Sequence, residues 1–200
     1  MTILGIDEVG RGCWAGPLVA GAVLYEEDFV VPAGAEWRLA DSKVLTKKQR
    51  ETADEAIRQS ALAYGLGWVD NREIDELGLT ASVALAMRRA TDAVLAIVDD
   101  DSRPSVDKII IDGSINYLPD LPQAVAIVKA DGTVPAVSAA SIIAKVARDK
   151  WMASEAERLH PGYGFFRHVG YGTKVHQAAL AELGVSALHR RSFRPVAALC

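Results

Sequence analysis

The sequence predicts an α/β fold in which helices pack on a mixed β-sheet. Short apolar runs bounded by turn residues indicate strands, and longer segments carry apolar residues at helical spacing. Half of the 200 residues are apolar, which is enough for a substantial core. Because no repeat, low-complexity tract or Pro/Ser-rich linker interrupts the chain, we expect a single domain over residues 1–200.

Five strands are expected, each a run of apolar residues bounded by glycine, proline or polar residues. The first, ILGID, leads into a glycine-rich loop, GRGCWAGP, and the second is LVAGAVLY. The third alternates poorly and is assigned from its flanking residues. The fourth and fifth are continuous apolar runs, which are typical of strands covered on both faces. The expected ranges are 3–7, 18–25, 62–69, 108–111 and 124–128.

Four helical segments are expected, each with a signal at an end or along one face. Thr46 can cap the first, because its hydroxyl can accept from a free backbone N–H. Gly78 is expected to break the second, and Gly184 to stop the last. Isoleucines and valines at helical spacing define the third. The expected ranges are 46–61, 73–98, 138–159 and 174–183.

The composition argues against a membrane or secreted protein. No stretch reaches the roughly 18 uninterrupted apolar residues of a membrane span. The start, MTILGIDEVG, has no positively charged segment of a secretory signal. Cys13 and Cys200 cannot form a disulfide framework and lack zinc-site spacing. We therefore expect a cytoplasmic protein with no membrane contact.

The net charge of −4 is unevenly distributed along the chain. Residues 145–200 hold nine Lys/Arg against four Asp/Glu, together with all four histidines, whereas residues 1–144 hold thirteen against twenty-two. An acidic part with candidate metal ligands and a basic part suit a metal-dependent enzyme that acts on a polyanion. Ordinary scatter of surface charge gives the same pattern, so this observation has modest weight.

Three acids follow apolar strands: Asp7 after ILGI, Asp112 after KIII and Asp131 after AVAIVKA. Glu8 adds a fourth. Such strand ends meet at one edge of a partly parallel sheet, where α/β folds bind ligands. Carboxylates gathered in one cleft repel one another unless a cation binds, and carboxylates suit Mg²⁺ or Mn²⁺. The alternative is that these are independent loop acids.

One motif in the first loop resembles a nucleotide-binding fingerprint but lacks its context. Residues 10–15 match G-x-G-x-x-A, which requires a helix directly after the glycines. Here Gly16-Pro17 and a strand follow instead, and Asp7 and Glu8 would repel a pyrophosphate. The chain also has no GxxxxGK[ST] loop, so we reject a nucleotide cofactor.

Eight motifs in series, covering nearly the whole chain, resemble the type 2 ribonuclease H family (ribonuclease HII) of bacteria. They are GIDEVGRG, LADSKVLT, IIIDG, VKADG, SAASIIAKVARD, HPGYGF, VGYGTKVH and HRRSF. The resemblance implies a ribonuclease H-like fold with a five-stranded mixed sheet that begins with three antiparallel strands. It also implies hydrolysis of the phosphodiester 5′ to a ribonucleotide, in an RNA–DNA hybrid or in duplex DNA with embedded ribonucleotides, leaving 3′-hydroxyl and 5′-phosphate ends.

By this resemblance, Asp7, Glu8, Asp112 and Asp131 match the family's catalytic acids, which bind two divalent ions, Mn²⁺ or Mg²⁺. A two-metal mechanism requires no general-base histidine, and we expect His176, at helical spacing from the apolar residues of its segment, to be a packing residue. Residues from about 160 onward would form a helical, substrate-binding part.

The resemblance also implies a set of substrate contacts. Gly10, Arg11 and Gly12 match the loop whose backbone reads the 2′-hydroxyl, and the side chain of Arg11 could either contact a phosphate or form a structural salt bridge. Tyr171 matches an aromatic residue that stacks on the adjoining deoxyribose. Further matches, to contacts with backbone phosphates, are Lys43, Ser141 and Lys145.

Two details bear on these contacts. Cys13-Trp14 departs from many relatives, which carry proline first, and this affects only the shape of the loop. Lys145 and Arg148 are expected on the less apolar side of their helix, where a phosphate could reach them.

Two other functions remain alternatives: a non-catalytic module that binds RNA–DNA hybrids, and a DNA-directed nuclease of the same fold. A pure binder would gain nothing from concentrating negative charge against a polyanion. The glycine-rich loop and Tyr171 argue against a DNA-only substrate. We expect a monomer, and no terminal motif indicates a protein partner.

Overall fold

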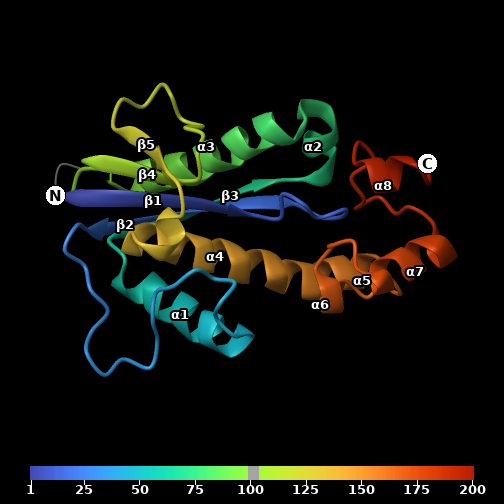
Figure 1. Cartoon of the computed structure of the whole chain (residues 1–200), viewed down its shortest axis with the longest axis horizontal. Coiled ribbons are helices and arrows are strands. Elements are labelled where there is room, and N and C mark those ends of the chain that lie inside the picture. The colour runs from blue at the N-terminus through green and yellow to red at the C-terminus, as the bar shows by residue number, and fades with distance from the viewer. Residues whose placement is uncertain (99–103) are drawn as a thin grey trace.

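A five-stranded mixed sheet lies at the centre of the computed structural model, which describes residues 1–98 and 104–200 (Figure 1). The strand order is β3-β2-β1-β4-β5. β1, β2 and β3 are antiparallel neighbours, whereas β4 is parallel to β1 and β5 is parallel to β4. The expected mixed sheet is confirmed, with strands at Thr2–Val9, Leu18–Glu26, Ala63–Val69, Lys108–Asp112 and Ala124–Ile127.

Helices cover both faces of this sheet (Figure 1). On one face, α3 (Leu79–Val98) packs on β3 and β2, preceded by α2 (Asn71–Leu77). On the other, α4 (Pro135–Trp151) packs on β1 and β2, with α1 (Lys47–Ser60) against it. The core is therefore two apolar layers, each between the sheet and a long helix.

Glycines in the strands let both long helices approach the sheet closely. A Cβ at Gly67 of β3 would lie 1.9 Å from the carbonyl oxygen of Ala86 on α3. A Cβ at Gly5 of β1 would lie 2.1 Å from the carbonyl carbon of Ala136 on α4. Any larger residue would push a helix away from the sheet.

The C-terminal part has a small apolar core of its own. A π-helical turn (η2, Met152–Ala156) extends α4 into α5 (Glu157–Leu159). Three further helices follow: α6 (Phe165–His168), α7 (Lys174–Leu183) and α8 (Arg194–Ala197). Buried Phe165, Leu180 and Met152 pack together in this part. In Figure 1, α5 to α8 gather at the end of the molecule opposite the chain's N-terminus.

The helices differ from the sequence-based expectations at a few points. α4 begins at Pro135 rather than at 138, because proline is well suited to the first position of a helix. The break at Gly78 is confirmed, and α2 begins at Asn71 because Asp70 caps it. The short helices α6 and α8 were not expected. Among the described residues, no helix has the length and apolar character needed to cross a membrane.

Candidate active site

Three carboxylates from separate elements converge at one edge of the sheet. Asp7 belongs to β1, Asp112 ends β4, and Asp131 lies in a 3₁₀ turn (η1, Ala130–Gly132) after β5. Each offers one oxygen, and these oxygens all lie within 4.8 Å of one another. The parallel pairing of β1 with β4 places Asp7 and Asp112 at the same edge.

The position of Asp131 differs in detail from the sequence-based expectation, which placed it at a strand end. β5 ends at Ile127, and the chain then turns through Lys129, whose backbone is left-handed (φ 60°). This turn brings Asp131 back to β4, where its backbone N–H donates to Asp112 Oδ1 over 3.4 Å. The convergence therefore depends on a turn as well as on the sheet.

Glu8 lies beside these acids but outside the group of three. β1 continues through Val9 in regular register with β2, so successive side chains point to opposite faces. The Glu8 carboxylate instead accepts a hydrogen bond from Arg11 Nη1 at 3.1 Å. Its charge still raises the pKa of Asp7.

Burial and mutual repulsion make the acids hold protons more tightly. Burial, then the charges of Glu8 and Asp112, raise the pKa of Asp7 to about 8. A hydrogen bond from Ser141 opposes this rise. Burial, then Asp112, also raises the pKa of Asp131. A hard divalent cation would relieve the same repulsion, and three carboxylate oxygens at this spacing are ligands that fit Mg²⁺ or Mn²⁺.

Ser141 is buried rather than exposed to a phosphate. Its hydroxyl lies 2.9 Å from Ser42 Oγ and hydrogen-bonds to the Asp7 carboxyl. Lys43 is exposed, and its charge lowers the pKa of Asp131, which indicates that its ammonium group is near the acids.

The loop after β1 is exposed at Arg11 and Gly12. Gly10 has a φ of 92°, a conformation that side-chain-bearing residues rarely adopt. The guanidinium of Arg11 forms the salt bridge with Glu8, which was the alternative to a phosphate contact. The backbone at Gly12 meets open space: a Cβ there would have no neighbour within 4 Å.

Tyr171 is exposed, with 39% of its surface accessible, as its glycine-rich surroundings predict. Lys145 Nζ lies 5.8 Å from the centre of the ring and also pairs with Asp149. Burial of the hydroxyl raises the pKa of Tyr171 to about 12. Tyr171 therefore offers a ring face at the surface, with the ammonium of Lys145 beside it.

The sequence-based placement of Arg148 was wrong. We expected it on the less apolar side of its helix, within reach of a phosphate, but it is fully buried. Arg190, from the HRRSF motif, is also fully buried, and burial lowers its pKa to about 10. The sequence pattern could not reveal that either side chain is buried, because both donate to backbone carbonyls of a loop that is distant in sequence.

His176 is a packing residue, as expected. It is fully buried and stacks on His168, with 4.4 Å between ring centroids. Its Nδ1–H donates to the carbonyl of Tyr171 at 3.0 Å, and its Nε2 lies 3.0 Å from Nε2 of His189. Sequence analysis did not foresee that these histidines form one cluster.

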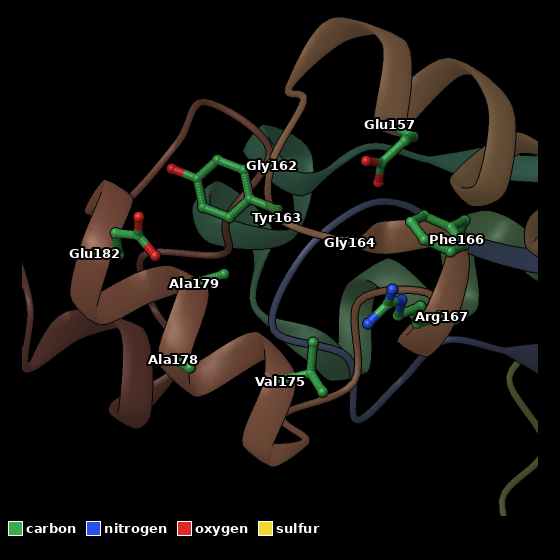
Figure 2. Close-up of a pocket in the computed structure, with 10 residues that line it drawn as sticks. All are labelled: Glu157, Gly162, Tyr163, Gly164, Phe166, Arg167, Val175, Ala178, Ala179 and Glu182. Carbon is green, nitrogen blue, oxygen red and sulfur yellow. The ribbon is translucent and has the colours of Figure 1, made fainter.

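The C-terminal part also contains a pocket of about 340 Å³ between α5, α6 and α7 (Figure 2). Glu157, Tyr163, Arg167 and Glu182 are among its lining residues, and the four acids described above are not. This pocket is therefore separate from the candidate metal site.

Comparison with solved structures identifies the fold. The ribonuclease H2 from Pyrococcus horikoshii OT3 superposes with a TM-score of 0.74 at 26% identity, covering 100% of this chain and 97% of that one. Bst-RNase HIII, solved in complex with Mn²⁺, superposes with a TM-score of 0.71 at 22% identity, covering 98% of this chain and 68% of that one. The fold is thus that of the ribonucleases H.

Sequence comparison then gives the family. The model for ribonuclease HII matches residues 4–196. A ribonuclease HII of Thermus thermophilus is 44% identical over 98% of this chain and 88% of its own length. That of Hyphomonas neptunium is 46% identical over 98% and 95%. The chain belongs to the ribonuclease HII family, whose members are ribonuclease H hydrolases acting on RNA–DNA hybrids with divalent metals.

A third solved structure is similar over almost its whole length. It is the complex of PCNA with RNase HII from Archaeoglobus fulgidus, which superposes with a TM-score of 0.75 at 25% identity, covering 97% of this chain and 96% of that one.

Proposed function

We propose that this chain is an endoribonuclease that hydrolyses the phosphodiester 5′ to a ribonucleotide, in RNA–DNA hybrids and in duplex DNA with embedded ribonucleotides. The products would carry 3′-hydroxyl and 5′-phosphate ends. One observation carries the proposal: in a chain of this family, Asp7, Asp112 and Asp131 have carboxylate oxygens within 4.8 Å of one another. Such a cluster serves metal-dependent hydrolysis, and it would oppose the simple binding of a polyanion.

The four acids would hold the metal. Asp7, Asp112 and Asp131 supply oxygen ligands, with Glu8 beside them. Two Mn²⁺ or Mg²⁺ ions, when bound, supply an activated water and stabilise the leaving 3′-oxygen. Ser141 and the backbone N–H of Glu8 both donate to the Asp7 carboxyl, which favours the ionised form that can bind a cation.

Substrate recognition would use exposed groups around this centre. The backbone at Gly10, Arg11 and Gly12 would contact the 2′-hydroxyl, since the glycines allow close approach. Tyr171 would lie against the neighbouring deoxyribose and reject a 2′-hydroxyl there. Lys43 and Lys145 would contact phosphates, whereas buried Ser141 would act through Asp7. Residues from about 160 onward would form the substrate-binding helical part of one domain, and the protein would act as a cytoplasmic monomer.

The decisive experiment uses two matched DNA duplexes, one of them containing a single ribonucleotide. With Mn²⁺ or Mg²⁺, we expect one cut, 5′ to the ribonucleotide, with the stated ends. The all-DNA duplex should stay intact. Binding of the ribonucleotide duplex without cleavage would support the hybrid-binding alternative, and cleavage of the all-DNA duplex would support a DNA-directed nuclease.

A further inference from the structure

Two fully buried arginines come from distant parts of the chain, Arg148 from α4 and Arg190 from the segment between α7 and α8. Among residues 1–98 and 104–200, no ion pair within 4 Å involves either side chain. A buried charge without a counter-ion is costly unless hydrogen bonds satisfy it. Here backbone carbonyls fill that role, so the guanidinium groups fix the segments that supply them.

Arg190 binds the loop that follows β1. Its Nε and Nη2 donate to the carbonyl oxygen of Gly16 at 3.0 and 2.9 Å. Its Nη1 donates to the carbonyl oxygen of Arg11 at 3.1 Å. The planar guanidinium therefore binds both ends of this loop at once, which a lysine ammonium cannot do with the same geometry.

Arg148 connects the same loop to the segment that carries Tyr171. Its Nε donates to Pro17 O at 2.7 Å and its Nη2 to Ala15 O at 3.2 Å. Its Nη1 donates to Val169 O at 2.9 Å, two residues before Tyr171. A Cβ at position 10 would lie 2.4 Å from Arg148 Nε, so a glycine there makes room for this side chain.

The contact with the Arg11 carbonyl also sets the direction of the next N–H. In a trans peptide, the C=O and the following N–H point in opposite directions, and the described residues contain no cis peptide bond. Since the Arg11 carbonyl points inward to Arg190, the Gly12 N–H points outward. Gly12 is exposed, and its N–H donates to no other residue in the described part of the chain.

We infer that Arg148 and Arg190 are positioning residues for recognition of the ribonucleotide. Arg190 turns the Gly12 N–H toward the place of the 2′-hydroxyl, and Arg148 fixes the position of this loop relative to Tyr171. A hydrogen bond from Trp14 N to Gly170 O, 2.8 Å long, also connects the loop to the segment that carries Tyr171. The inference rests on the proposed function, and it concerns residues that reach the substrate only through the backbone.

The test compares Arg190→Lys and Arg148→Lys with Val94→Ala, which removes buried apolar atoms from α3 and does not touch the loop. For each variant, Tm, kcat/KM on a duplex with one ribonucleotide and Kd for the all-DNA duplex are measured. Both lysine variants should lose at least about tenfold in kcat/KM, while Kd for the all-DNA duplex stays within about twofold. Val94→Ala should lower Tm without changing either value.

Two results would overturn the inference. One is a lysine variant with a lower Tm and a kcat/KM equal to that of Val94→Ala. The other is protection of the Gly12 amide from exchange in the free wild-type protein.

Amide exchange in the wild type, followed by NMR, stays informative if the variants do not fold. The Gly12 amide should exchange fast in the free protein and be protected by the ribonucleotide duplex. Protection in the free protein would show that the N–H points inward. Failure of the wild type to cut the ribonucleotide duplex would instead refute the proposed function.

Discussion

Asp112 is the residue whose replacement best isolates chemistry from folding. It is half-buried at the end of β4, and within the described residues its carboxylate accepts one hydrogen bond, a long one from Asp131 N at 3.4 Å. Asp112→Asn should therefore fold normally, and the loss of a repelling charge should leave Tm unchanged or slightly raised. Activity with Mg²⁺ or Mn²⁺ should fall at least about a hundredfold, because a proposed metal ligand is lost.

Thermal melting with and without Mn²⁺ gives this variant a second readout. Since a cation relieves the repulsion among the acids, Mn²⁺ should raise the Tm of the wild type, and much less that of Asp112→Asn. Near-normal cleavage by the variant, or an unchanged response to Mn²⁺, would contradict the assignment.

Tyr171 should contribute through its ring. Stacking of an aromatic side chain on a base contributes about 1–3 kcal/mol, and we take the low end of this range for contact with a deoxyribose, so Tyr171→Ala should lower kcat/KM at a lone ribonucleotide at least about fivefold. Tyr171→Phe keeps the ring and is the matched control, with activity within about threefold of the wild type. Equal activities for the alanine and phenylalanine variants would contradict a stacking role.

Residue by residue, the convergence of Asp7, Asp112 and Asp131 could be predicted from the sequence, because each follows an apolar run and has a glycine nearby. Arg148 could not. Its charge and its spacing on the helix both favoured the surface, and its burial depends on carbonyls of Ala15, Pro17 and Val169, from loops remote in sequence. The burial of Ser141 was not foreseen for a similar reason, because its partners Ser42 and Asp7 belong to other elements, and its contact with a phosphate stays a prediction.

At the scale of elements, β3 shows how helix packing requires glycine. A Cβ at Gly67 would lie 1.9 Å from a backbone carbonyl of α3, which cannot move without displacing the helix. Gly67→Ala should therefore cost about 2–3 kcal/mol in the free energy of unfolding. Gly132→Ala is the matched control, because a Cβ there has no neighbour within 4 Å, and its cost should be under about 1 kcal/mol. Denaturant unfolding of both variants checks this, and equal costs would contradict it.

The elements were predictable where local signals agree. Continuous apolar runs predicted β4 and β5, Thr46 predicted the start of α1, and Gly78 predicted the end of α2. The η1 turn was missed, because a left-handed lysine at position 129 has no signal in its residue type. That turn brings Asp131 to Asp112, so the sequence indicated the acid but not its route to the site.

At the scale of the whole molecule, the charge distribution overstates the basic surface of the C-terminal part. Two of its nine Lys/Arg, Arg148 and Arg190, are fully buried, and they organise the loop after β1. Sequence counts cannot separate these arginines from exposed ones. The C-terminal part thus serves the proposed site through buried contacts as well as through surface charge.

The buried histidines link the stability of this part to pH. Burial lowers the pKa of His176 and of His189 to about 4, from the ordinary value of 6.5. Below about pH 6.5 these two histidines therefore bind more protons in the unfolded chain than in the folded one, so they cost no stability above that pH and lower it as the pH drops toward 4. The loss should be on the order of 2–3 kcal/mol per histidine, and it should loosen the turn that holds Tyr171 through its carbonyl.

Melting curves between pH 7 and 5 test this coupling by comparing variants that share every carboxyl group. Asp7, with its pKa raised to about 8, stabilises the fold as the pH falls and does so equally in each protein, so the informative quantity is the difference between them. His176→Asn should be less stable than the wild type at pH 7, and this difference should shrink as the pH falls to 5. His160→Asn, outside the stacked cluster, is the control and should follow the wild type. If His176→Asn shows the same loss of stability as the wild type between pH 7 and 5, this buried histidine is not what makes the fold sensitive to acid.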